Sequence, residues 1–165
     1  MSNSTSNPVK VFFSYCHRDE SFKEGLEEHM AQLRREEKLA TWSDRELIPG
    51  EDWDETIKEN LLTSDVVLFL VSSSFIASHA CWDVEVTEIL KRRDQGGKVE
   101  LVPVILRPCE WHESILGKFQ GLPKDGKAVS TWEDRDEAYL NIVKGIRALL
   151  KSFQSKKKEE GSAEG

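Results

Sequence analysis

The feature that most constrains the fold is an unbroken apolar run, Val66–Val71, near the middle of the chain. This run is too short to cross a bilayer, and it is rich in β-branched and aromatic side chains, which favour a buried strand. Shorter apolar segments on both sides of it alternate with segments of helical spacing. We therefore expect strands and helices to follow one another along the chain.

The alternation defines the predicted elements. Strands are expected at Val9–Ser14, Leu39–Trp42, Val66–Val71, Leu101–Leu106 and Ala128–Val129, and helices over about residues 19–35, 53–63, 77–93 and 134–153. Strands that alternate with helices imply parallel βαβ units with right-handed crossovers. The predicted fold is α/β: a flavodoxin-like three-layer sandwich whose five-stranded parallel sheet has the order 2-1-3-4-5, with helices on both faces. Pro103 indicates that its strand lies near an edge or a bulge.

The length of 165 residues suits one compact domain. Residues 1–8 are small and polar and are expected to form a disordered lead-in. Residues 9–153 would be the folded domain, and residues 154–165 a polar tail or a linker in a longer parent protein, which could carry a sensor domain.

Charge and cysteine content exclude several classes of protein. The net charge of −7 argues against a nucleic-acid partner, and we find neither a secretory signal nor a membrane segment. The odd number of cysteines, three, favours reduced thiols in a cytoplasmic protein. His79 with Cys81, and Cys109 with His112, are close in sequence, but they match no zinc pattern, so we expect no metal.

The common nucleotide-binding and hydrolase motifs are absent. The first strand runs into Ser14-Tyr-Cys-His-Arg-Asp19 without a G-x-G-x-x-G, and the chain has no P-loop and no G-x-S-x-G elbow. The acidic residues that a phospho-acceptor receiver domain needs after its first strand are also missing.

Ligands of such sheets bind at the carboxyl ends of the strands, which places function in residues 14–19, 43–52, 72–81 and 107–127. Near one of these ends, Glu85 lies at the margin of an apolar helix face that contains Trp82 and Val86. A carboxylate in this position is a candidate for chemistry, although an edge glutamate paired with Arg or Lys is the structural alternative. Arg18, Arg45 and Arg107 lie in the same region and would meet phosphates or form surface salt bridges.

Several segments resemble one family. Val11-Phe-Phe-Ser-Tyr15 is similar to the first box of Toll/interleukin-1 receptor (TIR) domains, and Trp42-Ser-Asp-Arg-Glu-Leu-Ile-Pro-Gly50 resembles their second box and BB loop. The segment from Ser72 to Glu85 resembles the one that carries the family's catalytic glutamate. Val102-Pro-Val-Ile-Leu-Arg-Pro-Cys-Glu-Trp111 and Leu122-Pro-Lys-Asp-Gly-Lys127 resemble the prokaryotic branch.

The resemblance implies an activity and its residues. Many such domains cleave NAD⁺ to nicotinamide and ADP-ribose or a cyclic variant, and Glu85 matches their catalytic glutamate. NAD⁺ would be the substrate, and no cofactor is implied. Substrate contacts are expected from Phe13, Ser14, Tyr15, Ser43, Asp44, Gly50, Trp53, Trp82 and Trp111. Relatives often place an aromatic residue four positions before the glutamate, where this chain has Cys81; its aromatic Trp82 stands three before.

The resemblance also implies assembly. TIR domains associate with themselves or with other TIR domains, here through the BB-loop residues Arg45, Ile48, Pro49 and Gly50. The leading hypothesis is an NAD⁺ glycohydrolase that self-assembly activates, with a role in signalling or anti-phage defence. The alternatives are a non-enzymatic adaptor that acts by TIR–TIR contact and a sensor that binds nucleotide without turnover.

Overall fold

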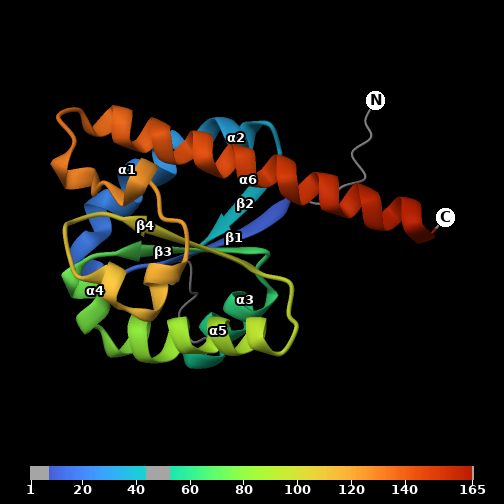
Figure 1. Cartoon of the computed structure of the whole chain (residues 1–165), viewed down its shortest axis with the longest axis horizontal. Helices are drawn as coiled ribbons and strands as arrows, with labels where there is room; N and C mark the ends of the chain where they lie inside the picture. The colour runs from blue at the N-terminus through green and yellow to red at the C-terminus, as the bar shows by residue number, and fades with distance from the viewer. Residues whose placement is uncertain (1–7, 44–52, 165) are drawn as a thin grey trace.

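The computed structural model of the chain describes residues 8–43 and 53–164. Four strands form one sheet in this part of the chain, and helices cover both of its faces (Figure 1). The strands are β1 (Val9–Ser14), β2 (Leu39–Trp42), β3 (Val66–Val71) and β4 (Glu100–Ile105). All neighbouring strands are parallel, in the order β2-β1-β3-β4. The predicted flavodoxin-like α/β architecture and the order of its first four strands are confirmed.

The helices fall where the sequence shows helical spacing, but two predicted helices are divided. The α-helices are α1 (Glu20–His29), α2 (Ala31–Arg35), α3 (Trp53–Thr63), α4 (Ser73–Ala77), α5 (Thr87–Asp94) and α6 (Arg135–Glu164). A π-helix, η3 (His79–Val86), lies between α4 and α5. The 3₁₀-helices are η1 (His17–Asp19), η4 (Trp111–Glu113), η5 (Ile115–Lys118), η6 (Lys124–Gly126) and η7 (Val129–Thr131). The break between α4 and η3 falls at Ser78, whose backbone is extended.

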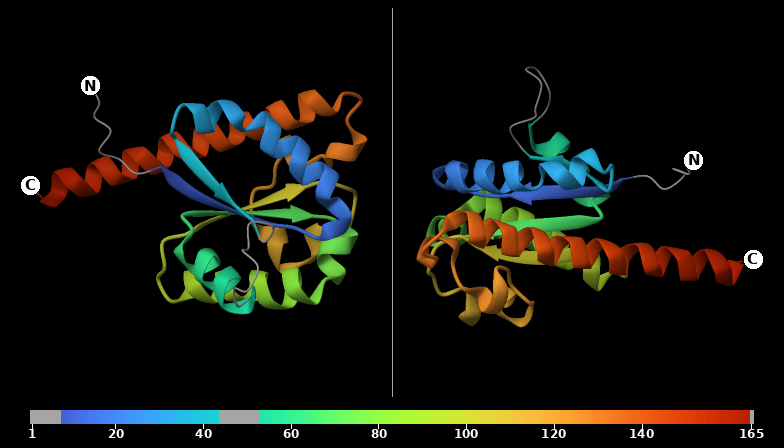
Figure 2. Two further views of the ribbon diagram at one scale, coloured as in Figure 1. Left: turned by 180° about the vertical axis from the view of Figure 1, so that it is seen from behind. Right: turned by 90° about the horizontal axis from the view of Figure 1, so that it is seen from above.

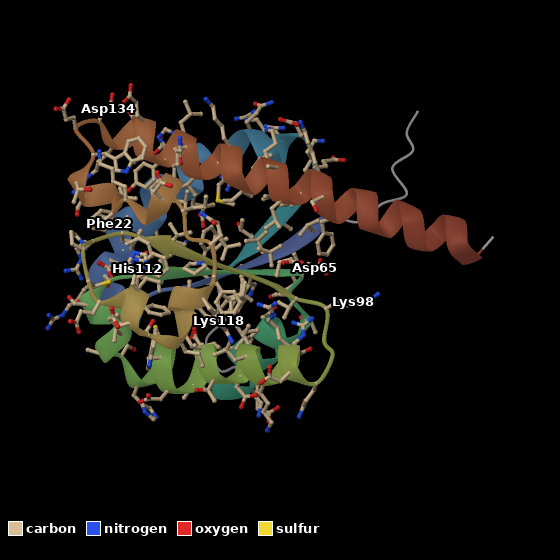
Figure 3. All side chains as sticks on the ribbon, in the orientation of Figure 1. Phe22, Asp65, Lys98, His112, Lys118 and Asp134 are labelled. Carbon is tan, nitrogen blue, oxygen red and sulfur yellow. The ribbon has the colours of Figure 1, made fainter. Side chains whose placement is uncertain are left out.

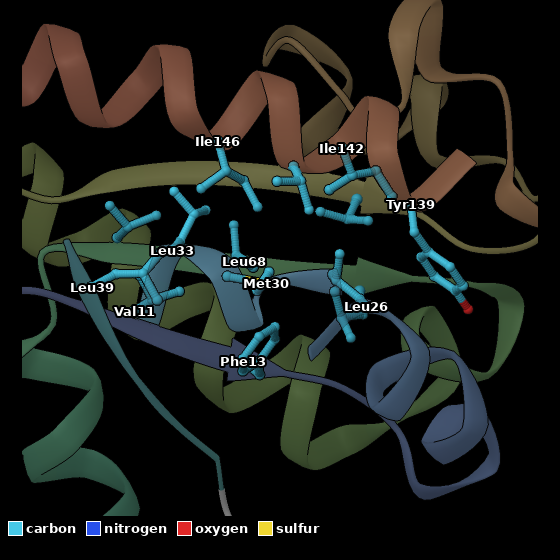
Figure 4. Packing of buried hydrophobic residues seen from close by; sticks show 14 of the residues in the cluster. Val11, Phe13, Leu26, Met30, Leu33, Leu39, Leu68, Tyr139, Ile142 and Ile146 are labelled. Atoms are coloured by element: carbon cyan, nitrogen blue, oxygen red, sulfur yellow. The ribbon is translucent and has the colours of Figure 1, made fainter. Parts of the chain in front are cut away.

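The two faces of the sheet carry separate apolar cores, because successive strand residues point to opposite sides. α1, α2 and α6 cover one face, and α3, α4, η3 and α5 cover the other (Figure 2). Figure 4 shows the first core, in which Phe13 of β1 and Leu26 of α1 are buried together. In the second core, Phe69 of β3 is buried with Ile57 of α3 and Ile89 of α5.

The predicted fifth strand at Ala128–Val129 does not form in the described structure, since residues 129–131 are helix η7. Leu122 takes its place beside β4: it makes an isolated parallel bridge with Val104, and its N–H donates to the Pro103 carbonyl. Two apolar residues supply too few ladder hydrogen bonds to hold a strand. Pro103 lies in the edge strand of the four, where its missing N–H costs no sheet hydrogen bond.

The last helix continues beyond the expected end of the domain at Phe153. α6 reaches Glu164, and its final turns project past the sheet (Figure 1, Figure 2). Residues 156–160, Lys-Lys-Lys-Glu-Glu, are good helix formers, which explains why the polar segment stays helical. No helix in residues 8–43 and 53–164 combines the length and the apolar character that crossing a membrane would require.

Candidate functional site

The carboxyl ends of the strands gather the segments in which we expected the site. Figure 3 shows Phe22 and His112, which follow β1 and β4, at one end of the sheet. Asp65 and Lys98, which precede β3 and β4, lie at the opposite end. In parallel strands this polarity is the same for every strand, so the segments after β1, β3 and β4 come together at one edge.

Glu85 is held at this edge by the end of β1. The carboxylate lies in η3 and is 8% exposed, and it accepts a 2.7 Å hydrogen bond on Oε1 from the hydroxyl of Ser14. Ser14 is the last residue of β1 and is also buried. A hydroxyl donor orients a carboxylate without cancelling its charge. The pair therefore presents an oriented carboxylate at the carboxyl edge of the sheet.

Glu85 also lines a pocket of about 360 Å³ between α3 and η3. The pocket has mainly apolar walls with a few polar groups, which is the usual character of a small-molecule site. Its described lining consists of Ile57, Lys58 and Leu61 of α3, His79, Ala80, Val84 and Glu85 of η3, and Glu88 of α5. This arrangement can hold a flat, weakly polar group beside a fixed carboxylate.

The π-helix explains why Glu85 is more buried than the margin of an α-helix would make it. A π-helix has i→i+5 hydrogen bonds, so residues four and five apart lie on one face. Cys81, four residues before Glu85, is buried accordingly. Trp82 instead packs edge-on against Phe75, with ring centroids 6.1 Å apart, and does not line the Glu85 pocket. Trp82 is therefore not brought together with Glu85 in the described pocket, and its contact with substrate stays a prediction.

Phe13 and Tyr15 do not lie with Glu85 either. Both belong to the core under α1 and α6, on the opposite face of the sheet. Figure 4 shows Phe13 in this core. The Tyr15 hydroxyl donates to Glu20 Oε2 at 2.8 Å. Because side chains alternate along a strand, only Ser14 of these three residues can face η3. The structure therefore does not bring Phe13 and Tyr15 together with Glu85, and their contact with substrate stays a prediction.

Trp111, from which we expected a substrate contact, lies in the interior of the domain. Its side chain is 4% exposed and belongs to the core on the α5 side. Gly126, at φ +69°, lets the chain pass close to its indole: a Cβ built on Gly126 would lie 2.7 Å from the ring. Trp111 is thus a core anchor for the segment that follows β4.

The remaining predicted site residues lie at the edge of the described part of the chain or outside it. Ser43 follows β2 and is fully buried, and its hydroxyl has no hydrogen-bond partner in the described structure. Trp53 begins α3, but its side chain lies outside the description. The other predicted positions outside the described residues are Asp44, Arg45, Ile48, Pro49 and Gly50.

A partly buried ion pair, whose acidic partner the sequence did not identify, joins the ends of three strands. The Asp19 carboxylate, 1% exposed, accepts hydrogen bonds from Ser72 Oγ at 2.5 Å and from Arg107 Nε at 3.0 Å. Arg107 Nη2 also donates to Ser74 Oγ at 2.8 Å. Of the two interpretations of Arg107, the salt bridge is the one formed. Polar residues directly after β1, β3 and β4 were the available signal, but sequence alone does not reveal which of them pair.

The cysteines and other potential ligands do not form a metal centre within residues 8–43 and 53–164. Cys16, Cys81 and Cys109 form no disulfide bond among the described residues. Burial raises the pKa of the Cys109 thiol, which keeps it protonated at neutral pH.

Comparison with known proteins agrees with the fold and the motifs. The family model for the TIR domain matches residues 11–142. An uncharacterized protein, y4lF, of Sinorhizobium fredii is 41% identical over 137 residues, which is 83% of this chain. The match covers 42% of that relative, so this chain aligns with less than half of its length.

A solved structure shows the same architecture. The TIR domain of the Toll-related receptor TRR-2 from Hydra magnipapillata superposes with a TM-score of 0.61 at 19% identity, covering 83% of this chain and 97% of that one. A prokaryotic SEFIR domain covers 82% and 90% of the two chains at 18% identity, with a TM-score of 0.46. With the family model matching most of its length, this chain belongs to the TIR domain family.

Proposed function

We propose that this TIR domain cleaves the bond between nicotinamide and ribose in NAD⁺ and that Glu85 is its catalytic residue. The observation that carries the proposal is the buried Glu85 carboxylate, oriented by Ser14 at the wall of a pocket of about 360 Å³. The pocket is large enough for a nicotinamide ring and part of its ribose. Ser14, which orients Glu85, ends β1 at the edge where parallel α/β sheets bind ligands.

The chemistry requires few groups. Nicotinamide in NAD⁺ is already cationic, so when the bond from ribose C1′ to the ring nitrogen breaks, the electron pair neutralises the leaving group. The ribose passes through an oxocarbenium-like transition state, which a fixed carboxylate stabilises electrostatically. Water then adds to C1′ and releases a proton, which yields ADP-ribose. Attack by a group of the substrate itself in place of water would yield a cyclic product.

The surface beside the pocket supports self-association as part of this function. Val84 lines the pocket and is 45% exposed, and Leu62, next to the lining residue Leu61, is 37% exposed. Large apolar side chains exposed at a pocket mouth favour coverage by another protein surface. We therefore include assembly of TIR domains, which would enclose the pocket and exclude water, in the proposed mechanism.

The test is nicotinamide release from NAD⁺ by the wild type, by Glu85→Gln and by the matched control Glu88→Gln, which changes a second carboxylate of the same pocket. We expect Glu85→Gln to lower the rate by about 100-fold or more, since charge stabilisation in a transition state commonly contributes this much. Glu88→Gln should stay within a few-fold of the wild type. No release at high protein concentration, or equal rates for wild type and Glu85→Gln, contradicts the catalytic proposal.

The same variant separates an enzyme from an adaptor. An adaptor that acts only by TIR–TIR contact would keep its partner binding and its signalling in Glu85→Ala but lose both when Pro49 or Gly50 is replaced. The enzyme proposal expects Glu85→Ala to abolish signalling while partner binding persists. A shift in heat stability with NAD⁺ but no product would identify a nucleotide sensor instead.

A further inference from the structure

A second hollow is lined by residues that come shortly before those of the Glu85 pocket in the chain. It measures about 580 Å³ and is lined by Cys16, Arg18, Ser73, Ser74, Ala77 and Ser78, which lie around η1 and α4. The Glu85 pocket is lined by His79 and Ala80, the next two residues after Ser78. Consecutive Cα atoms are about 3.8 Å apart, so the linings of the two hollows come within one residue of each other at the junction of α4 and η3.

The hollow presents a cation that the fold leaves without a partner. Arg18 is exposed, and among the described residues it makes no hydrogen bond or ion pair. The carboxylates next to it in sequence are already engaged, because Asp19 accepts from Ser72 and Arg107, and Glu20 accepts from Tyr15. The guanidinium therefore remains available to an anion from outside the protein.

The hydroxyl groups of the hollow supply further donors. Ser74 Oγ accepts a hydrogen bond from Arg107, and Ser78 Oγ accepts one from the Cys81 N–H. Neither of these bonds uses the proton of the serine hydroxyl. A serine hydroxyl has one donor as well as its acceptor sites, and Arg presents planar N–H pairs that suit phosphate oxygens. The combination recognises a phosphate group, and the hollow is open enough for a phosphate that stays partly hydrated.

We propose that this hollow binds the phosphates of a dinucleotide whose nicotinamide end enters the Glu85 pocket. The assignment deepens the proposed function and rests on it for the identity of the dinucleotide. It places Arg18 as a residue that binds substrate at a distance from the bond that breaks. A contact of this kind holds ground state and transition state equally, so it acts on KM and leaves kcat nearly unchanged.

The test follows the amide signals of ¹⁵N-labelled full chain during titration with ADP-ribose and, separately, with inorganic pyrophosphate. It compares wild type, Arg18→Gln and the matched control Arg35→Gln, which replaces an exposed arginine of α2 that also lacks a partner among the described residues. We expect ADP-ribose to shift residues 16–18 and 73–80. We also expect Arg18→Gln to raise its Kd about tenfold, as loss of one charge-assisted contact does, while Arg35→Gln behaves as the wild type.

Two results overturn the assignment: equal ADP-ribose affinity in Arg18→Gln and Arg35→Gln, or pyrophosphate binding here while ADP-ribose shifts nothing near Glu85. Because the titration needs no turnover, it tests the hollow even if the wild type releases no nicotinamide. Where turnover is measured, Arg18→Gln should raise KM for NAD⁺ about tenfold with kcat within threefold of the wild type. An unchanged KM contradicts the proposal.

Discussion

The Ser14 hydroxyl donates a 2.7 Å hydrogen bond to Glu85 across a buried gap between β1 and η3. These residues are 71 positions apart in the chain, and only the parallel pairing of β1 with β3 brings them together. The bond fixes how the carboxylate stands in its pocket. It makes Ser14 a positioning residue for the proposed reaction.

Ser14→Ala should therefore lower kcat for nicotinamide release by about tenfold, because hydrogen bonds to charged groups contribute about 1.5–3 kcal/mol and each 1.4 kcal/mol is a tenfold change. Steady-state kinetics at saturating NAD⁺ measures this. The matched control is Ser64→Ala, which removes a buried serine at the amino end of β3, where its hydroxyl donates to the Asn60 carbonyl. This control should lower the free energy of unfolding by about 1 kcal/mol and leave kcat unchanged. Equal kcat values for the two variants would refute the positioning role of Ser14.

The ion pair between Asp19 and Arg107 should contribute strongly to stability. Arg107→Met leaves the buried Asp19 carboxylate with only its serine partner, and we expect the free energy of unfolding to fall by about 2–3 kcal/mol. This expected loss is smaller than the loss from breaking a fully buried ion pair, because the Arg107 side chain is 35% exposed. Urea unfolding measures the change. In Asp19→Asn/Arg107→Met, the loss should be smaller than the sum of the two single losses; strict additivity speaks against direct coupling.

Acid should weaken the contact between α2 and α6. Arg147 donates to both carboxylate oxygens of Glu36 at 2.9 Å, and these hydrogen bonds lower the pKa of Glu36 to about 2 from its usual 4.5. A lowered folded-state pKa stabilises the fold above pH 4.5, and this contribution disappears as the pH falls from about 4.5 to about 2. The stability difference between wild type and Glu36→Gln should thus be present at pH 7 and vanish near pH 2. It should also shrink in 1 M salt, because both side chains are partly exposed. A difference that stays constant with pH contradicts the assignment.

Assembly should depend on the apolar surface beside the Glu85 pocket. Leu62→Asp places a charge on that surface, and we expect it to weaken self-association about tenfold, as measured by sedimentation velocity, and to lower activity per molecule in parallel. Leu140→Asp is the matched control, since Leu140 is similarly exposed, at 47% against 37%, but lies on α6 across the sheet. If both variants associate equally, the surface at Leu62 is not the interface.

The sequence was sufficient for the elements that depend on local pattern. The bounds predicted for β1, β2, β3 and α3 match those observed, because apolar runs bounded by polar turns leave few other positions for a buried strand or an amphipathic helix. The predicted strand at Ala128–Val129 failed since so short a segment depends on its neighbours, and Leu122 pairs with β4 instead.

From the sequence, the site could be predicted only in outline. The family motif and the carboxyl-edge rule for parallel sheets both select the segment around Glu85. The neighbours of Glu85 were harder to predict, since β1 is apolar on both faces and an unbroken apolar run carries no period of two. Nothing in Phe13-Ser-Tyr15 tells which side chain faces η3, and the π-helix, which turns Trp82 away from the pocket, has no signature in its sequence.

The sequence by itself therefore determined the α/β class, the order of the first four strands and the identity of the candidate carboxylate, because apolar periodicity and motif spacing are properties of the chain alone. Only the tertiary structure decided that Ser14 orients Glu85, that Arg107 is bound by Asp19 and that Arg18 has no partner among residues 8–43 and 53–164. These are contacts between strand ends far apart in sequence. Their geometry is set when the sheet assembles and the two cores close on its faces.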